Sequence, residues 1–160
     1  MIARTVLLSL LVFFNSVLFS QESRINRDDF YKAMSSDKIE LINSQQEIAK
    51  SAGVSAFEGA LLMKKAGLVN KVNDKLSLFK TGHKLLDKAI ENDGENAEFR
   101  FLRLMVQEHA PGILNYKSDI DSDSLLIKKR FNELRPEVKK AVIQYSKTSK
   151  VLKPSDFNGT

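Results

Sequence analysis

One short stretch of this chain is apolar on most sides but contains three polar side chains that can bind an anion. Arg100, Arg103 and Gln107 are spaced i, i+3 and i+7, which places them on one face of a helix. A guanidinium group presents a planar fork of N–H donors that fits a carboxylate. The stripe therefore predicts a groove that binds a peptide carboxylate or another anion. The alternative is an internal ion-pair network that aligns two helices, with Glu58 as a possible partner.

A second polar group follows in the run H-A-P-G-I-L-N-Y, from His109 to Tyr116. His109, Asn115 and Tyr116 could line a small polar pocket. Alternatively, these side chains close a turn by hydrogen bonding to backbone groups. The residues predicted to contact a partner are Arg100, Arg103, Gln107 and Tyr116.

Metal and thiol chemistry have little support in the sequence. The chain has no cysteine, so disulfides, thiolate ligands and a cysteine nucleophile are excluded. The run D-I-D-S-D-S from Asp119 imitates the start of a calcium loop, but Ser124 stands where that loop needs glycine and Arg130 where it needs glutamate. We interpret these acids as helix caps. His83 and His109 lack the spacing of a zinc site, and we expect no metal and no cofactor.

Catalytic motifs are also missing from the chain. It has no G-x-S-x-G, no phosphate-binding loop and no dinucleotide fingerprint. We therefore expect a protein that is not an enzyme. The alternative is a cell-envelope hydrolase that uses Glu58 or Glu98 with His109, for which a cleft and a raised carboxylate pKa would be needed.

The N-terminus has the composition of an export signal. Arg4 is its charged residue, and an uncharged apolar run over 6–14 follows. This run is shorter than the about 20 apolar residues that a membrane-spanning helix needs. We therefore expect residues 1–20 to be a signal peptide cleaved near Ser20, which places the protein in the periplasm or outside the cell. An uncleaved N-terminal anchor is the alternative.

Charge is distributed unevenly along the chain. The formal net charge is +5, and from Ser124 onward nine Lys and Arg stand against three acidic residues, a net charge of +6. A basic surface of this kind meets anionic lipid or polysaccharide, or it is a solvated helix face. Nucleic acid is the least expected partner of an exported protein. An alternative function is therefore peripheral membrane binding through the basic helices over 125–152. Their apolar face, which would then be exposed, consists of Leu126, Phe131, Val138, Val142 and Tyr145.

The elements that must position these groups are all helices. Apolar residues recur with a period of 3.6, and no run alternates like a strand. We predict one all-α domain over 21–152, built from antiparallel helical hairpins, and a flexible tail over 153–160. Asn26 and Asn96 are predicted helix caps, and Gly94 is predicted to have a positive φ. The predicted helices cover 27–34, 37–52, 56–66, 76–92, 97–109, 124–134 and 137–152.

One hairpin has the residue pattern of a tetratricopeptide repeat. Gly82, Leu86 and Ala89 match the small, large and small positions of the second helix of that repeat, and the helix that contains Gly59 is similar to its first helix. The chain thus resembles a single degenerate repeat with an insertion around 67–75. Stacked hairpins of this kind leave a concave face free for a partner, so the resemblance implies a binding module.

A longer part of the chain resembles a group of small exported proteins of flavobacteria. The resemblance is carried by A-F-E-G-A and by A-I-E-N-D-G-E-N-A-E-F-R-F-L-R-L-M-V-Q-E-H-A-P-G-I-L-N-Y. It implies an envelope location and supplies no mechanism. These features together predict a non-catalytic exported helical module that binds a protein or peptide partner in the cell envelope.

Overall fold

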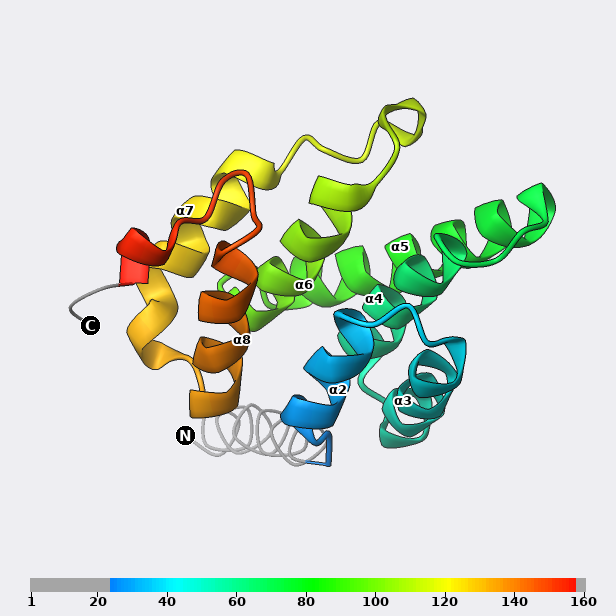
Figure 1. Cartoon of the computed structure of the whole chain (residues 1–160), viewed down its shortest axis with the longest axis horizontal. Helices are drawn as coiled ribbons and strands as arrows, with labels where there is room; N and C mark the ends of the chain where they lie inside the picture. Colours follow the sequence, from blue (N-terminus) through cyan, green and yellow to red (C-terminus); the bar gives the residue numbers. More distant parts are fainter. Residues whose placement is uncertain (1–23, 158–160) are drawn as a thin grey trace, which may run out of the picture.

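The part of the chain that the computed structural model describes, residues 24–157, is built from helices (Figure 1). It contains seven α-helices and three short 3₁₀-helices and no strand, which confirms the predicted all-α class. Within these residues no helix is both long and apolar enough to cross a membrane. The predicted signal peptide over 1–20 lies outside the described residues.

The helices follow one another through short connections. In chain order the α-helices are α2 (Arg27–Met34), α3 (Ile39–Ala52), α4 (Ser55–Ala66), α5 (Val72–Asn92), α6 (Ala97–His109), α7 (Ile120–Arg130) and α8 (Pro136–Ser146). The 3₁₀-helices are η1 (Gly112–Leu114), η2 (Phe131–Glu133) and η3 (Pro154–Phe157). Helices α2 and α6 begin and end at the predicted residues.

Local capping chemistry explains where several helices begin and end. The Asn26 side chain accepts a hydrogen bond from a first-turn amide of α2 at 3.2 Å, and Asn96 caps α6 through two amides. Helix α3 ends at Gly53, whose φ of 71° is a left-handed conformation that glycine adopts without strain. Gly94 does not have the predicted positive φ. It occupies the second position of a turn that closes through a hydrogen bond from the Asn96 amide to the Asp93 carbonyl, and the commonest turn type needs no positive φ there.

Four helix boundaries differ clearly from the prediction. Helix α7 ends at Arg130 instead of 134, and the 3₁₀-helix η2 follows it. Helices α5 and α7 begin about one turn earlier than predicted, at Val72 and Ile120. Helix α8 ends at Ser146 instead of 152. Beyond it the chain turns back, because the Ser149 hydroxyl accepts hydrogen bonds from two following amides and so competes with the helix.

The C-terminal segment is folded as far as it is described. The Phe157 side chain of η3 is buried, with its ring centroid 4.5 Å from that of Phe131. The predicted flexible tail over 153–160 therefore does not hold for 153–157, because an aromatic ring near the chain end finds an apolar site. Residues 158–160 lie outside the described part.

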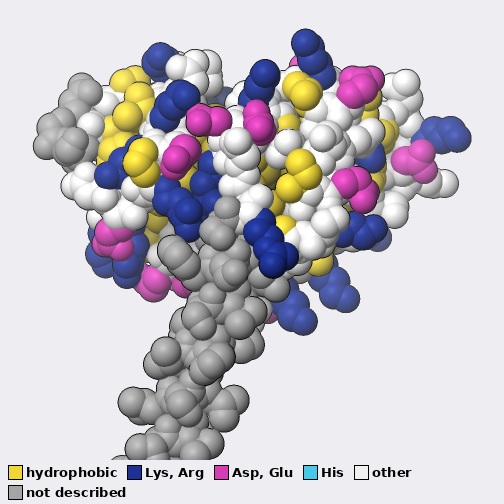
Figure 2. Space-filling model, turned by 90° about the horizontal axis from the view of Figure 1, so that it is seen from below, with side chains coloured by type: hydrophobic (Ala, Val, Ile, Leu, Met, Phe, Trp, Pro, Cys, Tyr) yellow, Lys and Arg dark blue, Asp and Glu magenta, His cyan; other side chains and the backbone are white. Residues whose placement is uncertain are grey.

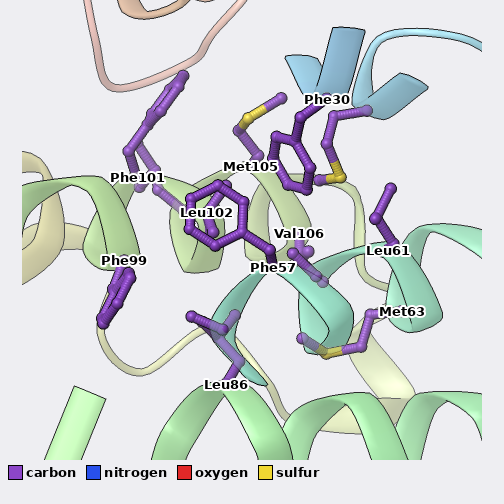
Figure 3. Packing of buried hydrophobic residues seen from close by; sticks show 14 of the residues in the cluster. Phe30, Phe57, Leu61, Met63, Leu86, Phe99, Phe101, Leu102, Met105 and Val106 are labelled. Atoms are coloured by element: carbon purple, nitrogen blue, oxygen red, sulfur yellow. The ribbon is translucent and has the colours of Figure 1, made fainter. Parts of the chain in front are cut away.

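Helix α4 lies at the centre of the fold and contacts α2, α3, α5 and α6. Helix α6 also contacts α5 and α7, as its apolar surface predicts. Figure 3 shows the aromatic rings at this junction. The Phe57 ring of α4 lies 4.6 Å from the Phe30 ring of α2 and 6.3 Å from the Phe99 ring of α6, measured between centroids. Removing such large apolar groups from water is the main stabilising contribution to folding.

Helices α4 and α5 approach each other backbone to backbone at two glycines. A Cβ atom added to Gly59 would lie 2.6 Å from the carbonyl oxygen of Gly82, and one added to Gly82 would lie 2.5 Å from the carbonyl oxygen of Gly59. Gly59 lies near Leu86, whereas Met63, one turn further along α4, lies near Gly82, so the two helices run antiparallel. The contact leaves no space for a side chain at either glycine.

Candidate functional site

The arginine stripe of α6 is engaged inside the fold. Arg103 binds both carboxylate oxygens of Asp123 at 2.7 Å, and Arg100 donates to the same carboxylate at 2.9 Å. Asp123 is fully buried in the first turn of α7, and Arg103 is only 7% exposed. The stripe therefore forms an internal ion-pair network between α6 and α7, and its acid partner is Asp123 instead of Glu58.

Two further residues extend this network. Asp119 accepts a hydrogen bond from the amide of Gln107 at 3.4 Å and lies 3.4 Å from a guanidinium nitrogen of Arg103. Burial opposes the charge of Arg103, but the hydrogen bonds and the charge of Asp123 outweigh burial and raise the pKa of Arg103. Gln107 is fully buried, and its Oε1 has no hydrogen-bond partner among the described residues. Arg103 and Gln107 therefore do not present the predicted open groove.

Tyr116 is buried against α5. Its hydroxyl donates to Asp87 at 3.3 Å, and its ring packs edge-on against Phe79 and His83 at centroid distances of 5.3 and 4.4 Å. His83 pairs with Asp87 one turn along the helix. Burial raises the pKa of Tyr116 far above its usual range. Tyr116 therefore anchors the segment after α6 onto α5, and its side chain is not a free contact for a partner.

The predicted pocket of His109, Asn115 and Tyr116 does not form. The His109 Nδ1 hydrogen-bonds with the Met105 carbonyl of its own helix at 2.9 Å. Asn115 adopts a left-handed conformation with a φ of 47°, and its amide donates to the Gly112 carbonyl at 3.0 Å. This geometry agrees with the alternative interpretation, in which these residues close a turn.

A second buried ion pair, which the sequence did not predict, ties α2 to α6. Arg27 Nη2 lies 2.9 Å from Glu98 Oε2, and the Tyr31 hydroxyl donates to the same carboxylate at 3.1 Å. The guanidinium also lies 5.2 Å from the ring centroid of Phe57. Arg27 and Glu98 are 71 residues apart in the chain, so no local spacing could have indicated the pair.

The acid and base of the alternative hydrolase are not brought together. Glu98 lies in the first turn of α6 and His109 in the last, which separates them by about 16 Å at 1.5 Å per residue. Glu58 is half-buried on α4, and neither carboxylate hydrogen-bonds to His109. Neither glutamate forms the hydrogen-bonded pair with histidine that would favour acid–base catalysis.

No group of three side chains suited to holding a metal ion occurs within residues 24–157. The acidic run that begins at Asp119 is used in the fold, because Asp123 binds the two arginines and Asp121 lies in the first turn of α7. Acids at the start of a helix complement its dipole. The run therefore has the structural role of a helix start.

Two shallow hollows mark the described surface. One, of ≈ 400 Å³, is lined by Arg24, Glu47, Ile48, Ser51 and Ala52. The other, of ≈ 200 Å³, lies where α6 begins and is lined by Glu95, Asn96, Ala97, Glu98, Arg130, Glu133, Leu134 and Arg135. In the second hollow Arg130 bridges Glu95 and Glu133 at 2.7 and 2.8 Å. In the first hollow Glu47 and Ser51 lie one turn apart on α3 but form no hydrogen bond with each other. Neither hollow of the described surface therefore shows a nucleophile hydrogen-bonded to a base.

The C-terminal helices do not expose the apolar face that membrane binding would need. Phe131, Val138 and Val142 are buried in the core, and Leu126 and Tyr145 are half-buried. A face that is used in the core is not available to a bilayer. The expected exposure of this face is therefore wrong, and the alternative of membrane binding through it loses its support.

One large apolar side chain is almost fully exposed on a fixed loop. Ile113 of η1 is 94% exposed, whereas Tyr116, three residues later, is buried against α5. Between them Asn115 closes the turn through its left-handed backbone and its hydrogen bond to Gly112. The loop therefore holds Ile113 in solvent at a defined position.

Comparisons with known proteins give no family for this chain. No family model matches it, and neither a curated protein nor a solved structure is significantly similar to it. The resemblances to a tetratricopeptide repeat and to exported flavobacterial proteins stay predictions, and function has to be inferred from the residues themselves.

Proposed function

We propose that this chain is a non-catalytic, exported helical module that binds a protein or peptide partner in the cell envelope. The observation that carries the proposal is Ile113, which a fixed loop presents almost fully to solvent. Burying an isoleucine side chain contributes about 1.5–3 kcal/mol, and a loop that is already held by its turn hydrogen bond and by buried Tyr116 loses less conformational freedom on binding than a free one. An exposed apolar side chain can serve as the buried anchor of a protein interface.

The ionisable groups first considered for chemistry support a non-enzymatic role. Arg100 and Arg103 both pair with Asp123, and Glu98 pairs with Arg27. Groups that are paired and buried in this way stabilise a fold and are not poised to exchange protons with a substrate. A hydrolase that uses a carboxylate with His109 remains the weaker candidate.

The contact of α4 with α5 supports a tetratricopeptide-like hairpin. That repeat needs small residues where its two helices touch, and Gly59 and Gly82 occupy this position. Leu86 and Ala89, which match the large and the second small position of the repeat, are buried. Helical hairpins of this kind commonly serve as protein-binding modules.

The proposed envelope location follows from the N-terminal sequence. A single positive charge before a short apolar run is typical of a signal peptide. On this proposal residues 1–20 are removed near Ser20, and the helical domain functions in the periplasm or outside the cell.

A pull-down from the native envelope tests the proposal, with tagged wild type and Ile113→Asp compared by mass spectrometry. Leu125→Asp is the matched control, because Leu125 is also a large exposed apolar residue, on α7 and 67% exposed. We expect a partner that is retained by wild type and by the control and is lost with Ile113→Asp. Circular dichroism checks that each variant folds.

The absence of any reproducible partner, or a partner that Ile113→Asp retains, would contradict the proposal. Arg103→Glu is not a useful variant for this purpose. It would place two carboxylates side by side in the core, so loss of binding could reflect loss of the fold.

A further inference from the structure

The first two turns of α5 project beyond the body of the molecule together with the end of α4. Figure 1 shows this turn of the hairpin at the right-hand end of the view, away from the C-terminus. All residues from 71 to 77 are exposed. Among them are two apolar side chains, Val72, which is 76% exposed, and Leu76, which is 43% exposed. We call this end of the hairpin, residues 64–84, the hairpin tip.

The exposed apolar residues continue a stripe that is covered further along the same helix. Val72, Leu76, Phe79 and His83 are spaced i, i+4, i+7 and i+11, so they lie on one face of α5. Tyr116 packs on Phe79 and His83. The first half of the stripe, at Val72 and Leu76, is left open to solvent.

The hairpin tip is strongly basic. It contains six lysines and one acid, Asp74, which gives a net charge of +5. Lys64 forms an ion pair with Asp37, whereas the other five form none with the described residues. Figure 2 shows Lys and Arg side chains that project from the right-hand end and the lower rim of the molecule, with Asp and Glu side chains among them at the right-hand end. The lysines of the tip are Lys64, Lys65, Lys71, Lys75, Lys80 and Lys84.

The lysines of α5 are placed around the apolar stripe. At 100° per residue, Lys75 and Lys80 lie on opposite sides of the line from Val72 to Leu76, and Asp74 lies on the far side of the helix. The tip therefore presents an apolar centre with cationic flanks. This is the pattern of a helix that lies on an anionic bilayer.

We propose that the hairpin tip docks on an anionic lipid surface, with Val72 and Leu76 entering the headgroup boundary and the lysines meeting lipid phosphates. The tip projects, so it can reach a flat surface without a matching cavity. Its cations are all lysines, which act as point charges for diffuse negative surfaces, whereas protein interfaces favour arginine and are depleted in lysine. The site differs from Ile113, and the inference goes beyond the proposed function.

Co-sedimentation with vesicles tests this proposal. The protein, in the form in which its cell exports it, is mixed with vesicles of pure phosphatidylcholine or of phosphatidylcholine and phosphatidylglycerol in equal parts. The N-terminal segment is the same in all variants, so differences among them report the tip. We expect binding to the anionic vesicles to exceed binding to the neutral ones and to weaken as salt is raised.

Two pairs of variants locate the surface. Lys75→Glu with Lys80→Glu should lower affinity for the anionic vesicles by at least about tenfold, because each lysine near such a surface contributes measurably. Lys129→Glu with Lys150→Glu is the matched control from the basic C-terminal region, where both side chains are exposed. It should lower affinity by less than about threefold, as expected for charges that lie away from the bilayer.

A third variant tests insertion of the apolar centre. Val72→Ser with Leu76→Ser keeps every charge and should also weaken vesicle binding about tenfold, since buried apolar area contributes to interfacial binding. Leu125→Ser, another exposed leucine, is its control and should bind as wild type does. Equal binding to neutral and anionic vesicles would overturn the proposal.

The remaining outcomes identify other occupants of the tip. Equal loss of vesicle binding in the two lysine-pair variants would contradict the proposal. It would mean that binding is a general attraction between a basic protein and an anionic surface, not a property of the hairpin tip. Sedimentation equilibrium adds a second check. A dimer that dissociates in Val72→Ser/Leu76→Ser, together with no vesicle binding, would assign the tip to a second copy of the chain and overturn the lipid proposal.

Discussion

Arg103 of α6 and Asp123 of α7 form a two-point ion pair in the interior, with both N–O distances at 2.7 Å. The pair joins a helix that is apolar on most sides to the first turn of the next helix. Arg100 shares the same carboxylate, so one buried acid neutralises two cations in part. Together with Asp119 and Gln107, this arrangement fixes how α6 and α7 align.

Replacing Asp123 by asparagine removes the charge that balances Arg103. We expect the free energy of unfolding to fall by about 3–5 kcal/mol, because loss of one partner leaves an uncompensated buried charge. Asp121→Asn is the matched control, since Asp121 is exposed in the same turn of α7. It should change stability by less than about 0.5 kcal/mol. Urea denaturation followed by circular dichroism measures both.

A double variant separates the ion pair from the packing around it. Arg103→Met with Asp123→Leu removes both charges and keeps apolar volume, so it should recover part of the stability that Asp123→Asn loses. Equal stability of Asp123→Asn and Asp121→Asn would show that the pair does not hold the two helices together.

The close approach of α4 and α5 predicts the effect of adding a single methyl group. Gly59→Ala and Gly82→Ala should each destabilise the protein by about 1–3 kcal/mol or more, because the new Cβ would overlap a backbone carbonyl of the other helix. Alanine is otherwise favoured over glycine within a helix by about 1 kcal/mol. The helix preference for alanine and the steric overlap of its Cβ atom have opposite effects on stability, and the overlap should have the larger effect at both positions.

Gly112→Ala is the control for this pair. A Cβ atom at Gly112 meets nothing within 4 Å, and Gly112 is not among the residues with a positive φ. This variant should therefore be as stable as wild type or slightly more stable. A melting temperature that rises in Gly59→Ala would mean that the helices do not touch at that point.

Much of the fold follows from local sequence signals, as two helices illustrate. Asn26 and Asn96 both precede an apolar-periodic stretch, and both cap a helix as predicted. Side-chain oxygens that satisfy first-turn amides act within three residues, so their effect can be derived from the sequence alone. The end of α8 does not follow from such signals, because apolar periodicity continues to 152 whereas the Ser149 hydroxyl hydrogen-bonds to the backbone and turns the chain back.

The candidate site was harder to predict because its partners are distant in the chain. The spacing of Arg100 and Arg103 predicts their stripe, but their acid partner, Asp123, follows twenty residues after Arg103, where the local sequence indicates a helix cap. Arg27 and Glu98 are further apart still. The packing of the helices decides which charged side chains pair. Helical periodicity predicts which residues share one face of a helix, but it does not predict which element packs against that face.

The packing of Phe157 predicts that the C-terminus contributes to stability. Phe157→Ala should lower the free energy of unfolding by about 2–4 kcal/mol, because it empties a buried aromatic site beside Phe131. Ser155→Ala, at an exposed position of the same 3₁₀-helix, should have little effect. Thermal denaturation compares the two variants, and equal melting temperatures would restore the prediction of a flexible tail.

Two tyrosines, the buried Tyr116 and the half-buried Tyr145, predict how stability depends on alkaline pH. Burial raises the pKa of both Tyr116 and Tyr145 above the usual value of 10.0. A phenol with a raised folded-state pKa keeps its proton when the unfolded chain releases it, so stability is unchanged below pH 10 and falls as pH rises further. Each such group contributes a slope of about 1.4 kcal/mol per pH unit above that point.

Urea denaturation on both sides of pH 10 measures this slope, and Tyr116→Phe isolates one of the two groups. The variant should lose about 0.5–1.5 kcal/mol at neutral pH, because the hydrogen bond to Asp87 is gone. Its stability should then fall less steeply at high pH, because phenylalanine has no proton to release. A slope that Tyr116→Phe leaves unchanged would mean that Tyr116 ionises as freely in the folded protein as in the unfolded chain. The anchor that holds the Ile113 loop on α5 would then be looser than its burial indicates.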